Sequence, residues 1–123
     1  MKKILILASA AVVTVSAFAA PAAKPAPARA LSTADVVNLC ANKDNPQVVG
    51  FCNGFGQGVY DAYLVTRHPK KAPSTICVKQ PAPQRQQVLD DFLAWAGKNP
   101  QMNDKPAAEA ALRYLAERFP CAK

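Results

Sequence analysis

The chain of 123 residues contains few side chains that could carry out acid–base or nucleophilic chemistry. Its one histidine, His68, lies directly before Pro69 in a lysine-rich stretch. Asp90 and Asp91 are adjacent, so on a helix their carboxylates point in different directions and do not form a general acid and base pair. A catalytic nucleophile needs a neighbouring base, and the sequence offers no such pair. We therefore expect a protein that is not an enzyme and that carries no cofactor.

The four cysteines are the remaining candidates for chemistry. Zinc is not expected, because no CxxC pair is present and the single histidine has no matching spacing. The absence of CxxCH also argues against a c-type haem. An even number of cysteines in an exported chain indicates two disulfides. The cysteines are Cys40, Cys52, Cys77 and Cys121.

The N-terminus has the features of an export signal. The stretch MKKILILASAAVVTVSAFA combines a basic start, an apolar segment and a small-x-small cleavage site that ends at Ala19. We expect residues 1–19 to be a bacterial signal peptide, residues 20–30 to be a Pro/Ala-rich extended tether, and residues 31–123 to fold. The apolar segment is too short to span a membrane, so stable membrane insertion is not expected.

The charge of the chain indicates what kind of partner it has. The formal net charge is +7, and removal of Lys2 and Lys3 with the leader leaves 13 basic and 8 acidic side chains, a charge of +5. This suits an anionic surface or an acidic partner. Without a dense basic stripe or an aromatic platform, nucleic acid is not expected to bind. A basic loop on a rigid body suits insertion into a cleft of another protein. The residues of this candidate partner loop are Arg67, Lys70, Lys71 and Lys79.

Helical periodicity and capping residues predict an all-α fold, a small bundle of four main helices. Ser32 and Asp35 form a capping box for the first helix, and Asn45 with Pro46 is typical of the start of the second. The expected helices span about 33–41, 46–67, 83–96 and 106–119. Side chains expected to face the core are Val36, Leu39 and Cys40, then Val48, Phe51, Cys52, Phe55, Val59, Ala62 and Tyr63, then Val88, Leu89, Phe92, Leu93 and Ala96, and finally Ala108, Ala111, Leu112, Leu115 and Phe119.

The stretch GFCNGFGQGVYDAY, residues 50–63, places Gly50, Gly54 and Gly58 at intervals of four. It contains no GxxxxGK[ST] motif and follows no strand, so it is not a phosphate-binding loop. On a helix these glycines form a ridge that another helix can approach closely. The occupant is either a helix of the same domain, or a second subunit or partner protein. Asp61 lies beside the ridge, either at the surface or bonded to a backbone N–H of the following loop.

Four cysteines allow three pairings. Short connections favour an up-down arrangement of the helices. In that arrangement Cys40 ends the first helix at the end of the bundle where the second begins with Cys52. Cys77 precedes the third helix and Cys121 follows the fourth, at the opposite end. We therefore expect the disulfides Cys40–Cys52 and Cys77–Cys121.

Several motifs between about residues 34 and 121 together resemble one family. They are Leu39-Cys40, the run FCNGFGQGVYD from Phe51 to Asp61, Ile76-Cys77-Val78, the helix with Leu89, Phe92-Leu93 and Asn99-Pro100, and the closing Ala111-Leu112 and Phe119-Pro120-Cys121. This pattern is similar to the Rap/Tai family of immunity proteins, which neutralise peptidoglycan amidase effectors delivered by type VI secretion. Asn53 departs from it, since an apolar residue is usual there.

The resemblance implies a small helical periplasmic protein, often a dimer, that binds and blocks an effector enzyme. We therefore expect a periplasmic immunity protein that occludes the active site of a peptidoglycan amidase. The alternative is a periplasmic stress or acid chaperone, because small disulfide-linked helical proteins of positive charge also suit that role. A neighbouring gene for a small Cys-His peptidase would favour the immunity role. Exposure of apolar surface in acid would favour the chaperone role.

Overall fold

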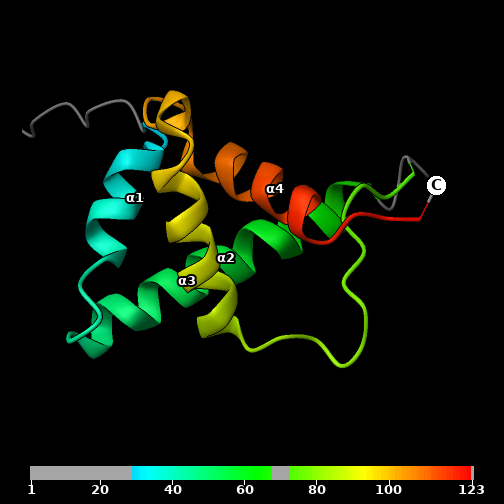
Figure 1. Ribbon diagram of the computed structural model, residues 1–123, viewed down its shortest axis with the longest axis horizontal. Coiled ribbons are helices and arrows are strands. Elements are labelled where there is room, and N and C mark those ends of the chain that lie inside the picture. Colours follow the sequence, from blue (N-terminus) through cyan, green and yellow to red (C-terminus); the bar gives the residue numbers. More distant parts are fainter. Residues whose placement is uncertain (1–28, 68–72, 123) are drawn as a thin grey trace, which may run out of the picture.

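The computed structural model describes residues 29–67 and 73–122, and this part of the chain is helical without a β-strand (Figure 1). Its elements are α1 (Thr33–Cys40), α2 (Pro46–Arg67), α3 (Arg85–Gly97), the short 3-10 helix η2 (Pro100–Met102) and α4 (Ala107–Arg118). The expected all-α class is confirmed, and every helix boundary lies within two residues of the expected one. The expected signal peptide, residues 20–28 of the tether, and His68, Lys70 and Lys71 lie outside the described residues.

Side-chain caps explain where the first two helices begin. The Ser32 hydroxyl accepts a hydrogen bond from the Asp35 backbone N–H, and the Asp35 carboxylate accepts one from the Ser32 N–H, both at 3.1 Å. This is the predicted capping box, which satisfies donors that have no partner within the helix. The Asn45 carboxamide oxygen accepts from the backbone N–H groups of Gln47 and Val48, at 3.0 and 3.3 Å. Both predicted helix starts are therefore confirmed.

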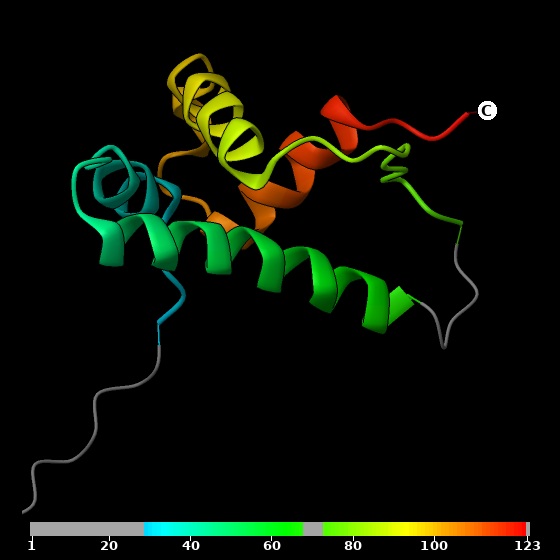
Figure 2. The ribbon, with the colours of Figure 1, turned by 90° about the horizontal axis from the view of Figure 1, so that it is seen from below.

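The longest helix, α2, lies along one side of the molecule, and α1, α3 and α4 all pack on the same side of it (Figure 2). In Figure 1, α1 and α3 run across the direction of α2. The helices thus cross one another rather than line up as up-down neighbours. One long face of α2 consequently has no helix of the described domain against it.

Both expected disulfides are confirmed. Cys40–Cys52 joins the end of α1 to the second turn of α2, across 12 residues of sequence. Cys77–Cys121 joins the segment before α3 to the tail after α4, across 44 residues. Next to it, the Cys77 N–H donates to the Phe119 carbonyl at 2.8 Å. On a chain-entropy estimate these closures stabilise the fold by about 3 and 4 kcal/mol, respectively.

Backbone hydrogen bonds also join the two ends of the domain. The Thr33 N–H donates to the Lys105 carbonyl, and the Ala107 N–H donates to the Leu31 carbonyl, each at 2.8 Å. The Thr33 hydroxyl donates to the same Lys105 carbonyl at 3.0 Å, and the Thr33 side chain is fully buried. These bonds fix the start of α1 against the start of α4.

The core lies where α1, α3 and α4 meet the inner side of α2. Its buried apolar residues are Val36, Cys40, Cys52, Tyr63, Ile76, Phe92, Ala96, Met102, Ala107, Ala110, Ala111, Tyr114 and Leu115. Four residues expected to face the core are instead exposed, so those expectations were wrong: Leu39, Phe51, Ala62 and Ala108.

The buried stripe of α4 differs from the expected one because long-range contacts set its rotation. Ala107 is held by its bond to Leu31, and it is buried in place of Ala108. Tyr114 is buried as well, with its ring centroid 5.6 Å from that of Phe92. Tyr114 was missed because its hydroxyl makes it a weak apolar signal in sequence, although its ring carries a large apolar area.

The rotation of α2 is set by two residues on its inner side. Cys52 is bonded to Cys40, and Tyr63, eleven residues further along, is buried on the same side. The Tyr63 hydroxyl oxygen accepts from the backbone N–H groups of Thr75 and Ile76 at 2.9 and 3.2 Å. Burial raises the pKa of this hydroxyl, but the hydrogen bonds from Thr75 and Ile76 outweigh it, so the pKa is lowered overall. Tyr63 thereby anchors the segment that leads to Cys77.

Replacing Tyr63 with Phe tests this anchor. We expect the free energy of unfolding in urea to fall by about 1–3 kcal/mol, because the N–H groups of Thr75 and Ile76 lose their acceptor. Tyr60→Phe, which removes a hydroxyl from a half-buried tyrosine of the same helix, is the matched control and should change stability by less than about 0.5 kcal/mol. Equal effects of the two substitutions would contradict the anchor.

Candidate functional site

The first candidate site is an uncovered face of α2, which we call the glycine stripe: Gly50, Gly54, Gly58 and Ala62. All four residues are exposed. A Cβ atom added at any of the three glycines would meet no heavy atom of the described residues within 4 Å. Of the two occupants considered from sequence, a helix of the same domain is not in close contact with these glycines in the described residues, since α4 lies beside the ridge across a groove. The reason is that Cys52 and Tyr63 turn the opposite side of α2 inward.

Large apolar side chains of α2 are exposed as well as the glycine stripe. Phe51 is 43% exposed and Val65 is 70% exposed, which is unusual for their residue types. Beside the stripe, Ala108 and Leu112 of α4 form the far wall of a shallow groove of about 460 Å³. The face therefore combines apolar composition with a bare backbone, and these properties favour close contact with another protein.

Asp61 forms a polar edge to the glycine stripe. It is exposed, and its carboxylate accepts a hydrogen bond from the Gln57 side-chain amide at 2.7 Å. Of the two roles considered from sequence, the structure places Asp61 at the surface.

The candidate partner loop is only partly described. Arg67 ends α2, and its guanidinium lies 4.8 Å from the centroid of the Tyr63 ring, in a cation–π arrangement. This half-buried arginine therefore helps to hold the helix end in place. Lys79 is exposed, whereas Lys70 and Lys71 lie outside the described residues.

A second hollow lies on the other side of α2. It has a volume of about 360 Å³ and is bounded by α2, α3, α4 and the segment that leads into α3. Side chains of the core, among them Phe92 and Leu115, line it together with Phe55, Val88 and Leu89. No pattern in the sequence indicated this cavity, because its size depends on how the helices pack across the fold.

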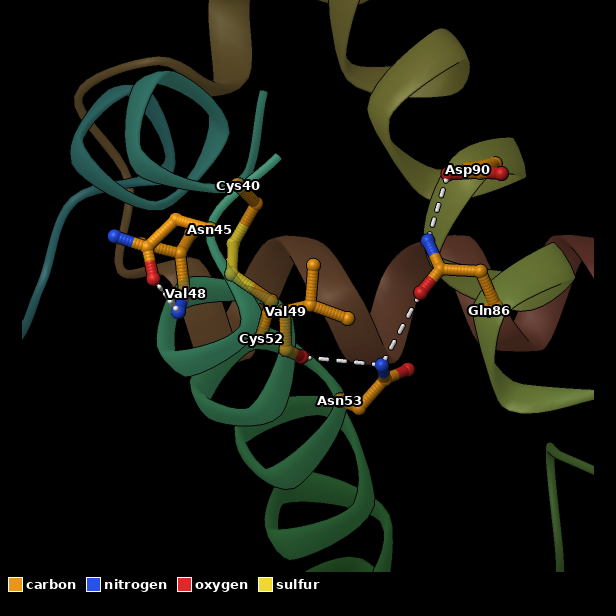
Figure 3. Close-up of a disulfide and its surroundings, with 8 residues drawn as sticks. All are labelled: Cys40, Asn45, Val48, Val49, Cys52, Asn53, Gln86 and Asp90. Carbon is orange, nitrogen blue, oxygen red and sulfur yellow. Dashed lines mark hydrogen bonds between the residues drawn. A yellow bond between two sulfur atoms is a disulfide. The ribbon is translucent and has the colours of Figure 1, made fainter. Parts of the chain in front are cut away.

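A chain of polar contacts crosses from α2 to α3 at the edge of this cavity (Figure 3). The Asn53 amide nitrogen donates to the Val49 carbonyl at 3.1 Å and to the Gln86 side-chain oxygen at 3.2 Å. The Gln86 amide nitrogen donates to the Asp90 carboxylate at 3.0 Å, and Lys43 pairs with the same carboxylate at 2.9 Å. Asn53, which the sequence showed only as a polar residue in an apolar motif, thus links two helices.

The described residues give no sign of a metal centre or a membrane span. Within 29–67 and 73–122, no three His, Cys, Asp or Glu side chains gather in a geometry that could hold a metal ion. No helix in the same ranges has the length and apolar character needed to cross a membrane.

These features define a class: a small, disulfide-linked helical protein with open apolar surfaces suited to protein contact. The sequence model of the Rap1a immunity proteins matches residues 32–121, and the chain belongs to this family. It is therefore an immunity protein, a class that acts by binding an effector, and the expectation that it is not an enzyme is confirmed. No curated protein and no solved structure gives a match.

The polar chain at Asp90 predicts a dependence of stability on pH. The hydrogen bond from Lys43, partly opposed by burial and assisted by Gln86, holds the pKa of Asp90 below its usual 3.8. A carboxyl group with a lower pKa in the folded state stabilises the fold above its unfolded-state pKa, and this contribution is lost as the pH falls through the folded-state value. We therefore expect Asp90→Asn to destabilise the protein at neutral pH by about 0.2–1 kcal/mol, the range for an exposed ion pair.

The difference between wild type and Asp90→Asn should shrink toward zero as the pH falls below 3.8 and then through the lower folded-state pKa of Asp90, because the group is then protonated in both the folded and the unfolded chain. Urea denaturation at a series of pH values measures it. Asp104→Asn, at another exposed carboxylate, serves as the control. A difference that is independent of pH would contradict the role of the Lys43–Asp90 pair.

Proposed function

We propose that this protein is a periplasmic immunity protein that binds a peptidoglycan amidase effector of type VI secretion and occludes its active site. The observation that carries the proposal is the uncovered glycine stripe on a chain of an immunity family. Along this stripe the backbone of α2 is not shielded by side chains, so an enzyme surface can approach within the reach of van der Waals contact. The amidase as target rests on the FCNGFGQGVYD and FPC motifs and their resemblance to the Rap/Tai proteins.

Export supports the same proposal. The two disulfides are typical of an oxidising compartment, and the first 19 residues have the features of a signal peptide. A cell-wall amidase acts in that compartment, so an inhibitor must be present there as well. The positive charge of the chain, to which Lys70, Lys71 and Lys79 contribute, would attract an acidic rim around the enzyme cleft.

The test is inhibition of the enzyme encoded beside this gene, where we expect a small Cys-His peptidase. Hydrolysis of peptidoglycan fragments by the purified enzyme should stop at an equimolar amount of this protein. Gly58→Arg should weaken inhibition by at least about tenfold, because it places an unpaired charge in the contact. Gly97→Arg, at an exposed glycine of α3, is the matched control and should inhibit fully. Hydrolysis that continues at excess wild-type protein would refute the proposal.

We propose a second copy of the chain as the alternative occupant of the glycine stripe. Two identical ridges of small residues can pack against each other around a two-fold axis, which gives a homodimer. Light scattering should then give twice the monomer mass, and Gly58→Arg should give the monomer mass. If Gly58→Arg is monomeric and still inhibits, the stripe is the dimer contact, and the effector contact is assigned to the basic residues Lys70, Lys71 and Lys79. A wild-type monomer at concentrations up to about 100 times those used for inhibition would exclude the dimer.

A further inference from the structure

The cavity between α2, α3 and α4 lies on the side of α2 opposite to the glycine stripe, and the effector contact proposed at the stripe does not use it. Protein interiors are normally packed without voids of this size. The cavity has a volume of about 360 Å³, and most of the side chains in its wall are apolar. Since an apolar cavity of roughly 150 Å³ binds benzene, this one has room for about fourteen carbon atoms.

The cavity is long rather than round. Its wall follows α2 from Cys52 to Tyr60, which is about 12 Å of helix axis. The wall also includes Val36 of α1 and Phe119, which follows α4. Val36 lies one helical turn from the Cys40–Cys52 disulfide, whereas Phe119 lies beside the other disulfide. An unbranched chain fits such a space better than a compact ring does.

The polar groups in the wall differ in whether a ligand can reach them. The Asn53 carboxamide oxygen and the Tyr114 hydroxyl oxygen are buried without accessible surface, so they are not available to a ligand. The groups that remain are the Gln57 amide, the Tyr60 hydroxyl and the Arg85 guanidinium. Arg85 is the one charged residue among the described residues of this wall. The charge of a ligand is therefore selected by Arg85.

Arg85 places its positive charge at the mouth of the cavity. It begins α3 and is exposed, whereas Phe92 and Tyr114 in the same wall are buried. No carboxylate of the described residues forms an ion pair with Arg85, although Lys43 nearby is paired with Asp90. A cation at the mouth of an apolar cavity complements a ligand that has an apolar body and an anionic end.

We propose that this cavity binds a single unbranched acyl chain that ends in a carboxylate, a free fatty acid of about ten to fourteen carbons. The chain would lie against Phe55 and Leu89 and remove apolar surface from water. The carboxylate would stay at the mouth, where the planar guanidinium of Arg85 can donate to both of its oxygens. This inference goes beyond the effector contact at the glycine stripe and does not depend on it.

The first test compares two probes with chains of ten carbons and opposite charge, sodium decanoate and decylammonium chloride. Isotope-labelled protein with both disulfides formed is titrated with each at pH 7, and amide resonances around Phe55, Val88 and Phe92 are followed by NMR. Decanoate should bind about two- to twentyfold more tightly, because Arg85 attracts one probe and repels the other, each by the amount typical of an exposed pair of charges.

Charge reversal at the mouth shows whether Arg85 makes this choice. In Arg85→Glu the order of the two probes should reverse, so that decylammonium binds more tightly than decanoate. Lys98→Glu makes the same change of net charge at an exposed residue outside the wall. This control should keep the wild-type order.

Chain length and cavity filling test whether the chain is buried. From hexanoate to octanoate to decanoate, the dissociation constant should fall about three- to fifteenfold at each step, because two more CH₂ groups leave water. Gly56 lines the cavity, and a Cβ there would meet no described atom within 4 Å, so Gly56→Leu can be introduced without a clash. It should weaken decanoate binding at least about tenfold. Gly97→Leu, outside the wall, should bind decanoate like the wild type.

The proposal is overturned if decanoate does not bind, if hexanoate binds as tightly as decanoate, or if Gly56→Leu leaves the affinity unchanged. It is also overturned if Arg85→Glu fails to reverse the order of the probes, or if Lys98→Glu reverses it as well. Flotation of the protein with phosphatidylglycerol vesicles, lost in Gly56→Leu, would replace the free fatty acid by a chain held in a membrane. The assay contains no effector. Inhibition without decanoate binding would therefore remove only the cavity assignment, and decanoate binding without inhibition would remove only the proposed function.

Discussion

The fixed rotation of α2 is the constraint on which the rest of the structure depends. Cys52 is bonded to Cys40, and Tyr63 holds the backbone of Thr75 and Ile76 through its hydroxyl oxygen. These anchors lie three turns apart on one side of the helix, so they determine which side faces the core. A 22-residue helix with four interior glycines has a weak intrinsic preference for the helical state, and such contacts are what stabilise it.

Two open surfaces follow from that rotation. On the outer side, the glycine stripe remains without a partner in the described domain. On the inner side, α3 stands far enough from α2 to leave the cavity near Asn53. Both surfaces are therefore built on one well-anchored helix, which lets each present a defined shape without reorganisation on binding.

The features that local signals determine were predicted well, and those that depend on long-range contacts were not. The caps at Ser32 and Asn45 act within three residues, so sequence locates both helix starts. The disulfide pairing was predicted correctly, although the up-down arrangement from which it was inferred is not the one observed, because Cys40 and Cys52 lie close together in the sequence on either side of the short turn between α1 and α2. The side of α2 that is buried could not be inferred, because apolar residues such as Phe51 occur all around the helix and the anchors act across the fold. The role of Asn53 was hidden for the same reason, since its partner Gln86 lies 33 residues away.

The disulfides stabilise the fold enough to offset the destabilising effect of the glycines in α2. Each interior glycine lowers helix stability by about 1 kcal/mol relative to alanine, and no close contact of the described domain offsets this at Gly50, Gly54 or Gly58. The two disulfide closures, worth about 3 and 4 kcal/mol, exceed the combined cost. The covalent links thus allow α2 to keep an exposed backbone that helix propensity alone would not support. A bare helix face adds nothing to a core that does not touch it, and this supports the proposal that the stripe serves contact with another protein, as binding to an effector requires.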